Sequence, residues 1–547
     1  MFYTANSQEL ELKIVPKDSL NNLVLKSIDY AQIHLTEKSL ISEIDSVSFQ
    51  LQKRGYLNNH LEEFKQNDSI YTAHYIIGDK TDLLKVYYDT GIIPKDIIRS
   101  RVTTINEEYF TTTIDQVSLI LNEIVNYLES NGNTFVEVSL KNLITVEVGF
   151  EAKLSINNLK NRSIDNIVVK GYSKFPKSFI KHYLNLQKGT IFNSNKITQI
   201  SDAINSLTFV SEIKPPEILF TKDSTSIYLY LQKNKSNVFD GLIGFSTNEK
   251  GKLEFNGHFD LALNNAFNGG ESIAVKWKSN GEDQKLFSLK LETPFIFNSN
   301  ITPEMSFDIY KQDTTFLNTK ASIDLKYILN PQTIVAAKYQ SENSNDLTTT
   351  NSQSSIREFK NNFYGVSFEK NIFGTKRDYQ NKFFFRLDAI WGNRTLISES
   401  LKTDQSKYEL TTYYNWSLNQ KNSIFIQNHS ALFISDELFT NELFRIGGTN
   451  SIRGFNEQSI FTSSHTILNL EYRYHLYNSS YLFSITDFAY INNDLLNNDT
   501  QLYSFGIGYE YKLKNGVINL SYALGKEADI PIDINNSRFH IKFFQFF

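Results

Sequence analysis

The residue whose type and setting most clearly predict chemistry is Arg453, at the tip of the stretch FRIGGTNSIRGFNEQS, residues 444–459. Phe and Ile are too dense here for a disordered segment, and the double glycine Gly447–Gly448 allows turns that other residues resist. We therefore expect a loop folded back into an enclosed, polar space. A guanidinium in such a space needs a carboxylate in fork geometry, which predicts a buried ion pair. The alternative is an ordinary glycine-rich hairpin connection.

The elements that must position this loop are strands, because from about residue 239 the sequence predicts nothing else. In the run around 463–476 the two faces differ, with Leu468, Leu470, Tyr472, Tyr474 and Leu476 on one and Asn469, Glu471, Arg473 and His475 on the other. Such alternation suits one face to lipid and the other to a polar lumen. Sixteen strands are predicted, at 239–247, 251–262, 271–279, 284–293, 303–311, 317–328, 332–341, 359–370, 380–390, 407–417, 422–432, 463–476, 481–491, 501–513, 515–525 and 537–547.

The connections between these strands differ in length in a regular way. The long ones, 342–358, 391–406, 433–462, 492–500 and 526–536, all follow odd-numbered strands, and the others are mostly short. This parity is hard to obtain from a soluble β-sandwich, whereas a barrel with long loops on one side of a membrane shows it. The pattern places the C-terminus and the residues before the barrel on the same, periplasmic side.

Composition supports this interpretation. The chain has 547 residues and a negative mean hydropathy, yet it contains 42 phenylalanines and 30 tyrosines, as expected of alternating strands with aromatic girdles. No window approaches the roughly 18 uncharged apolar residues of a membrane-spanning helix. The net charge of -5 provides no basic surface field of the kind that binds nucleic acid. The absence of cysteine from the sequence excludes disulfides and fits an exported protein. The N-terminus has no signal-peptide pattern, so the chain is either in its mature form or not exported, and the barrel pattern favours the mature form.

Residues 9–235 are predicted to be mixed α and β, with a β-α-α-β-β unit of about 75 residues that recurs three times. The last copy is the clearest, with a strand at 164–172, helices at 175–186 and 195–209 separated by Gly189, and strands at 210–218 and 226–232. The first and middle copies have helices at 39–56 and 115–132. These features predict domains at 9–80, 81–158, 159–236 and 237–547. Each small sheet leaves an edge for pairing with another chain, although the units could also be spacers that bind nothing.

In its loop motif and its N-terminal units the chain resembles the BamA/TamA superfamily. SIRGF after GGTN is similar to the V/I-R-G-F/Y signature of that family's sixth extracellular loop, and it too lies between the eleventh and twelfth of sixteen strands. The three N-terminal units resemble POTRA domains, and GLIGFS and LNNAFNGGESIAVKW resemble the first barrel strands. The resemblance implies N-terminal α+β POTRA repeats followed by a transmembrane antiparallel 16-stranded β-barrel. It assigns the loop motif to Gly447, Gly448, Ser451, Ile452, Arg453, Gly454 and Phe455.

The resemblance also implies partners for the loop arginine. Arg453 would reach into the lumen and pair with Asp487 on the thirteenth strand, with Glu471 as a second wall carboxylate. The sequence departs from the family's pattern in two ways. Asp487 shares its face with the apolar residues Phe483 and Ile485, and Ala489 replaces a glycine that the family has near this position.

The junction between the last and first strands is expected to be weak. Gly241 and Gly244 lie in the first strand, where glycine weakens pairing, and the last strand ends on the aromatic Phe547. In the family this seam is the lateral gate through which client strands enter the bilayer. The alternative for Phe547 is simple anchoring at the membrane interface.

No pattern for an enzyme is present. The sequence lacks G-x-S-x-G, P-loop, H-E-x-x-H and EF-hand patterns, and its nine histidines have no metal-ligand spacing. His475, on the polar face, is expected to be a wall residue. We therefore expect no active site, no metal and no cofactor.

The function implied by the resemblance is the insertion of proteins into the bacterial outer membrane, with the POTRA domains in the periplasm. The expected partners are unfolded outer-membrane or secreted client proteins, outer-membrane lipid and accessory periplasmic or lipoprotein subunits, and not nucleic acid. One alternative is a two-partner secretion translocator for a dedicated passenger, a class that usually carries two POTRA domains. The other is a passive porin-like barrel.

Overall fold

The computed structural model describes residues 10–17, 22–80, 83–146, 149–247, 253–280, 284–348, 355–374, 382–399, 401–477, 479–528 and 537–547. The chain divides into two compact units, Met1–Ser163 with Ile191–Lys196, and Ile164–Thr190 with Ile197–Phe547. Across the described ranges, no helix is both long and apolar enough to cross a membrane.

The first sheet has the strand order β2-β1-β4-β3 and is covered by helix α2 (Glu37–Lys53). The helix begins after Thr36, whose side chain accepts a hydrogen bond from the backbone nitrogen of Ser39 at 3.2 Å. Its apolar residues recur at helical spacing and pack on the sheet, at Leu40, Ile44, Val47 and Leu51. The other elements are β1 (Leu10–Pro16), α1 (Asn22–Lys26), β2 (Ile33–His34), β3 (His60–Asn67) and β4 (Ile70–Ile76).

The second sheet has the order β6-β7-β5-β9-β8. It comprises β5 (Leu83–Tyr87), α3 (Lys95–Ile98), η2 (Arg99–Arg101), β6 (Thr104–Ile105), β7 (Tyr109–Thr113), α4 (Ile114–Ser130), β8 (Glu137–Val146) and β9 (Gly149–Asn157). The sequence did not predict α3 or the β6–β7 hairpin. The hairpin is closed by a single side chain, because Asn106 Oδ1 accepts from the backbone nitrogens of Glu108 and Tyr109 at 2.9 and 2.8 Å.

The third sheet has the order β10-β12-β11, with β10 (Asn166–Lys170), α5 (Ser194–Asn205), β11 (Val210–Phe220) and β12 (Thr225–Lys233). The helix predicted at 175–186 is shorter than expected and of another type: the structure has a five-residue π-helix, η3 (Phe179–Tyr183). Its wider turn, closed by a bond of 2.8 Å from Leu184 N to Phe179 O, accompanies ring contacts of Phe179 with Phe209 and Phe295. The three domain boundaries drawn from the sequence stay a prediction.

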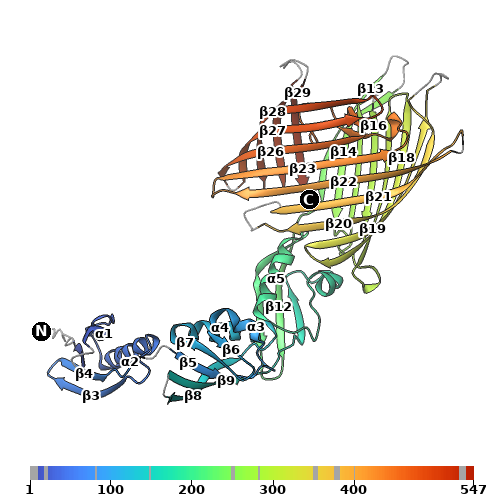
Figure 1. Ribbon diagram of the computed structural model, residues 1–547. Coiled ribbons are helices and arrows are strands. Elements are labelled where there is room, and N and C mark those ends of the chain that lie inside the picture. Colours follow the sequence, from blue (N-terminus) through green and yellow to red (C-terminus); the bar gives the residue numbers. More distant parts are fainter. Residues whose placement is uncertain are drawn as a thin grey trace. The chain divides into compact units, whose positions relative to one another are not determined.

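Sixteen of the strands after β12 close into one antiparallel barrel (Figure 1). They are β13 (Val238–Thr247), β14 (Leu253–Asn264), β15 (Ser272–Asn280), β16 (Gln284–Glu292), β17 (Ile301–Gln312), β18 (Phe316–Asn330), β19 (Thr333–Asp346), β20 (Phe359–Ile372), β21 (Phe383–Leu396), β22 (Lys402–Ser417), β23 (Asn422–Ser435), β26 (Ser464–Tyr477), β27 (Ser480–Asn493), β28 (Asn498–Leu513), β29 (Gly516–Glu527) and β30 (Arg538–Phe546). Each matches one predicted strand, so the expected 16-stranded barrel is confirmed.

The two faces of the barrel strands differ as the alternation predicts. On β27, Ile485, Asp487 and Ala489 are buried. Phe488 and Tyr490, which alternate with them and point to the other face, are 36% and 44% exposed. A strand whose outward face is aromatic and whose inward face carries a carboxylate suits lipid outside and a polar lumen inside.

The segment between β10 and α5, beside the third sheet, contacts the connections that follow β14 and β16. Asn265 Nδ2 donates to the Tyr172 hydroxyl at 2.8 Å, and that hydroxyl donates to Asn268 Oδ1 at 2.9 Å. The rings of Phe179 and Phe295 meet edge to face with centroids 5.0 Å apart. Because the barrel strands alternate in direction, the loop that carries Arg453, which follows β23, lies at the other end of the barrel.

Candidate functional site

The stretch around Arg453 is a loop between β23 and β26. It opens and closes with a short ladder of its own, in which β24 (Phe444–Ile446) pairs with β25 (Ile460–Thr462). Gly447 and Gly448 follow β24 with φ of 110° and 91°, a conformation that glycine adopts without strain. The Ser451 hydroxyl then accepts from the backbone nitrogen of Gly447 at 2.8 Å. These contacts fold the chain back on itself and present Arg453 to the barrel wall.

The structure brings Arg453 and Asp487 together inside the barrel. Arg453 Nε donates to Asp487 Oδ2 at 2.9 Å, Arg453 Nη2 donates to Oδ1, and the backbone nitrogen of Arg453 also donates to Oδ2, at 3.0 Å. The carboxylate thus takes a fork of two guanidinium bonds and one main-chain bond from a single residue. The Asp487 side chain is fully buried and that of Arg453 is 10% exposed. The contact fixes both the side chain and the backbone of the loop tip.

Glu471, the second wall carboxylate, lies between two arginines. One oxygen accepts from Arg453 Nη1, and the other accepts from Arg473 Nε at 2.9 Å. The Arg473 guanidinium lies over the Phe425 ring, 4.3 Å from its centroid. The sequence did not assign Arg473 to the site, although its place two residues after Glu471 on the same polar face was a usable signal.

Apolar contacts surround the tip of the loop. Ile452 is fully buried in a cluster with Ile446, Ile467, Ala489, Ile491 and Leu502, and Phe455 packs against it. These contacts explain why Ala489 and Ile491, on the same inward face as Asp487, are apolar, because this part of the face meets the loop and not water. A short polar contact, from Asn469 Nδ2 to Ser451 O at 2.9 Å, completes the attachment to β26.

Among the residues that the structure describes, the seam between the first and last strands pairs at only two positions, Val238 with Phe546 and Phe239 with Gln545. By comparison, β30 pairs with β29 at eight positions and β13 pairs with β14 at ten. The two pairs lie at the end of the barrel nearer the third sheet, where Phe547 N also donates to Asn237 O at 3.0 Å. Gly241 and Gly244 pair with Phe259 and Asn256 of β14 and not with β30.

A second buried ion pair in the same loop was not predicted from the sequence. Arg394 of β21 contacts Glu442, and both side chains are completely buried. Glu442 lies in a short turn, η5 (Thr440–Glu442), where no strand or helix periodicity marks an inward position.

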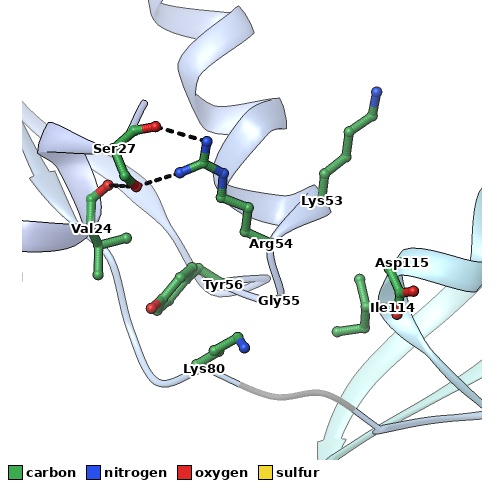
Figure 2. A pocket seen from close by; sticks show the side chains of 9 residues that line it. All are labelled: Val24, Ser27, Lys53, Arg54, Gly55, Tyr56, Lys80, Ile114 and Asp115. Atoms are coloured by element: carbon green, nitrogen blue, oxygen red, sulfur yellow. Dashed lines mark hydrogen bonds between the residues drawn. The ribbon is translucent and has the colours of Figure 1, made fainter. Parts of the chain in front are cut away.

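Elsewhere in the described part of the chain, no three or more His, Cys, Asp or Glu side chains are placed to hold a metal ion. A pocket of about 580 Å³ near α2 is lined by Lys53, Arg54, Lys80 and Asp115, among others. Figure 2 shows Arg54 turned toward Ser27, whose carbonyl oxygen accepts from Nη2 at 2.8 Å, and Lys53 pointing away from them. Arg54 therefore ties the end of α2 to the turn after α1, and we assign no chemistry to this pocket.

Two protein families match parts of the sequence. The POTRA family, described as surface antigen variable number repeat, matches residues 163–232. The family of the haemolysin secretion/activation proteins ShlB/FhaC/HecB matches residues 365–511. No curated protein matches the chain significantly.

Solved structures show the same fold at low sequence identity. CdiB from Acinetobacter baumannii superposes with a TM-score of 0.57 at 13% identity, covering 93% of this chain and 97% of that chain. CdiB from Escherichia coli gives a TM-score of 0.55 at 13% identity with the same coverage. BamA from Haemophilus ducreyi lacking POTRA domains 1-3 gives only 0.42 at 15% identity, over 78% of this chain and 92% of that chain.

These matches agree with the architecture. The POTRA match falls on the sheet that contacts the barrel turns, and the ShlB/FhaC/HecB match falls on the barrel wall that includes Glu471 and Asp487. With the closed barrel of sixteen strands, the two family matches support a bacterial outer-membrane protein that is similar to the BamA/TamA superfamily.

Proposed function

We propose that this protein inserts client β-strands into the outer membrane at the seam between β13 and β30. The observation that carries the proposal is the length of that seam, two paired positions against eight and ten at the neighbouring junctions. Unpaired backbone groups that face hydrocarbon each cost several kcal/mol, so the free edges of β13 and β30 favour pairing with another strand. A client strand is the natural partner, because its own backbone groups have the same requirement.

Capture of the client would take place on the POTRA side. The strands at the ends of the first two sheets, β3 and β8, are eight and ten residues long and have one unpaired edge each. In the third sheet the edge strand β11 contains Pro215 and Pro216 and two register shifts, which suit an edge that is protected from pairing. We therefore assign strand addition to β3 and β8, with these domains in the periplasm.

The process needs no covalent step, nucleotide or cofactor. Pairing at an edge satisfies the client backbone, and its apolar side chains then enter lipid. Arg453, held by Asp487 and Glu471, would keep the loop inside the barrel while the seam opens. Outer-membrane lipid and accessory subunits remain predicted partners of this scheme.

A second candidate is secretion of a dedicated passenger through the lumen. The ShlB/FhaC/HecB match over residues 365–511 favours it, as does the likeness of fold to CdiB. Against it stand the three N-terminal units predicted from the sequence, since two POTRA domains are usual for this class.

Depletion of the protein in its native cell, followed by quantitative proteomics of outer-membrane and secreted fractions, separates the two. Loss of many barrel proteins at once is expected for an insertase. Loss of one secreted protein with unchanged barrels would contradict insertion and establish the second candidate.

A disulfide across the seam tests directly whether the short pairing between β13 and β30 must open. The chain contains no cysteine, so two introduced cysteines can pair only with each other. Val238→Cys with Phe546→Cys would join the two strands where they already meet. Oxidation should stop insertion and reduction should restore it. The control is Val517→Cys with Phe544→Cys, which joins β29 and β30 at a fully paired junction and should have no effect. Normal insertion by the oxidised seam pair would overturn the proposal.

A further inference from the structure

The base of the Arg453 loop carries a contact as deeply buried as the one at its tip. Arg394, near the end of β21, and Glu442, in η5, form an ion pair in which neither side chain has any exposed surface. Buried charges are found where their partners satisfy them closely, and the loss of one partner leaves the other stranded. The pair therefore marks a point where the loop is held firmly to the wall.

Three neighbouring strands supply the partners of the Glu442 carboxylate. Its Oε2 accepts from Arg394 Nη1 at 2.7 Å, and its Oε1 accepts from Gln405 Nε2 of β22 at 3.0 Å and from Asn361 Nδ2 of β20 at 3.3 Å. Arg394 also donates to the carbonyl oxygen of Glu437 at 2.9 Å. The carboxylate is thus bound from three strands and both of its oxygens are used.

The preceding residue extends these contacts to two more strands. Asn441 Nδ2 donates to Ser344 Oγ of β19 at 2.6 Å and to the carbonyl oxygen of Arg357 at 2.7 Å. Asn318 of β18 donates from Nδ2 to the carbonyl oxygen of Asn441, at 2.6 Å. Two consecutive loop residues, Asn441 and Glu442, therefore join five adjacent strands, β18 to β22. We call this set of contacts the clasp.

The clasp lies at the end of the barrel away from the third sheet. Arg394 is two residues before the end of β21, and Gln405 is three residues after the start of β22, at the connection between them. The connections that meet the third sheet follow β14 and β16, and β21 runs in the opposite direction to those two strands. The clasp is therefore at the outer mouth.

From the clasp the loop runs to the other half of the barrel. Arg445 lies over the Tyr310 ring of β17, 3.7 Å from its centroid, before Arg453 reaches β26 and β27. Near the tip, Asn450 and Asn456 accept from Lys542 and Arg538 of β30, each at 2.9 Å. The loop is thus attached to the wall at its base and again at its tip, on different strands.

We propose that Arg394 and Glu442 are positioning residues that hold the base of the loop over the outer mouth and so close the lumen to solutes. The Arg453 contacts hold the tip independently, since no strand is shared between the two anchors. Opening the clasp should therefore open the lumen without releasing the tip or changing the seam. The inference concerns passage through the lumen, so it stands or falls separately from client insertion.

Single-channel recording of the purified full-length protein in planar lipid bilayers tests this. Glu442→Gln keeps the shape of the side chain and removes its charge, which leaves a buried guanidinium that draws in water. The open fraction should rise several-fold over the wild type. The matched control is Glu437→Gln, whose carboxylate is 3.5 Å from the same guanidinium but 57% exposed, and it should behave as the wild type.

A reversible tether separates opening of the clasp from general damage. Ser344→Cys with Asn441→Cys, placed in the Glu442→Gln chain, replaces the contact between these side chains by a disulfide. The oxidised protein should be closed and the reduced protein open. If Glu442→Gln does not fold, as judged by heat-modifiable migration on gels, the double variant Arg394→Gln with Glu442→Gln takes its place, because it leaves no stranded charge.

Three results would overturn the inference. The first is a folded Glu442→Gln or double variant that conducts no more than the wild type. The second is a tethered protein that stays open when oxidised, and the third is a wild-type barrel already as conductive as the variants. None of these readings depends on client insertion, which the seam disulfide tests by itself.

Discussion

Gly454 and Gly525 pass each other at backbone contact. A Cβ built on Gly454 would lie 2.4 Å from the backbone nitrogen of Gly525, and one built on Gly525 would lie 2.6 Å from the carbonyl oxygen of Gly454. The residue after Arg453 is therefore pressed against β29, and a side chain on either glycine would push the loop tip from the wall. This explains why glycine follows the arginine in the motif.

The first prediction is that Gly454→Ala detaches the loop tip. Its φ of +82° adds backbone strain of about 1–3 kcal/mol to the clash, so Arg453 could not reach Asp487 in its present geometry. Thermal unfolding of the purified full-length protein should begin at a lower temperature. Gly189→Ala is the control, because it has a φ of +88° with nothing within 4 Å of the added Cβ. Equal melting temperatures for the two variants would show that the close approach is unimportant.

The second prediction concerns the ion pair itself. Arg453→Ala leaves Asp487 and Glu471 buried without their main donor, which should lower the free energy of unfolding by about 3–5 kcal/mol. Arg453→Lys should recover little of this, since an ammonium cannot make the two-pronged bond. We expect activity to fall together with stability, as measured by denaturant unfolding and by client insertion in proteoliposomes.

The control for the ion pair is Lys278→Ala. Lys278 contacts Glu457 at 3.9 Å and is 44% exposed, so its loss should cost less than about 1 kcal/mol. An Arg453→Ala protein with wild-type thermal stability and wild-type activity would remove the role we give to this residue.

The third prediction separates packing from charge at the tip. Ile452→Ala removes a fully buried side chain from the cluster that includes Ile446 and Ala489, and should cost about 2–5 kcal/mol. Ile507→Ala, on the lipid side and 65% exposed, should cost much less, because lipid fills the space it leaves. Denaturant unfolding of both variants checks this. If Ile507→Ala lowers the free energy of unfolding as much as Ile452→Ala does, the cluster around Ile452 makes no special contribution to stability.

Much of the barrel was predictable because lipid and lumen impose opposite polarity on successive residues. The same rule put Glu471 on an inward face, while the pairing of Arg453 with Asp487 came from the resemblance and agrees with the geometry found. Alternation alone could not have assigned Asp487, since Phe483 and Ile485 share its face. Those two are inward because this part of the wall is packed rather than wet.

Other features left no periodic signal. Glu442 meets a residue 48 positions away and lies in a turn, so neither spacing nor a motif could have linked it to Arg394. The π-helix at Phe179–Tyr183 was predicted as part of an ordinary helix because its apolar residues suit both structures. Its contacts with Phe209 and Phe295 come from other elements, and these cannot be inferred from local sequence.

The fourth prediction concerns the contact between the third sheet and the barrel. A Cβ on Gly270 would lie 2.0 Å from the ring of Phe179, and its φ of +83° already disfavours a side chain, so Gly270→Ala should separate this sheet from the barrel turns. Hydrogen exchange should rise around Tyr172 and Phe295 while the barrel keeps its melting temperature, and insertion should fall because the client is no longer delivered to a fixed place. The neighbouring Gly269→Ala is the control, since its Cβ would meet only the flexible carboxylate of Glu271. If the two variants exchange at the same rate, the contact does not hold the sheet, and delivery to the seam must depend on another part of the chain.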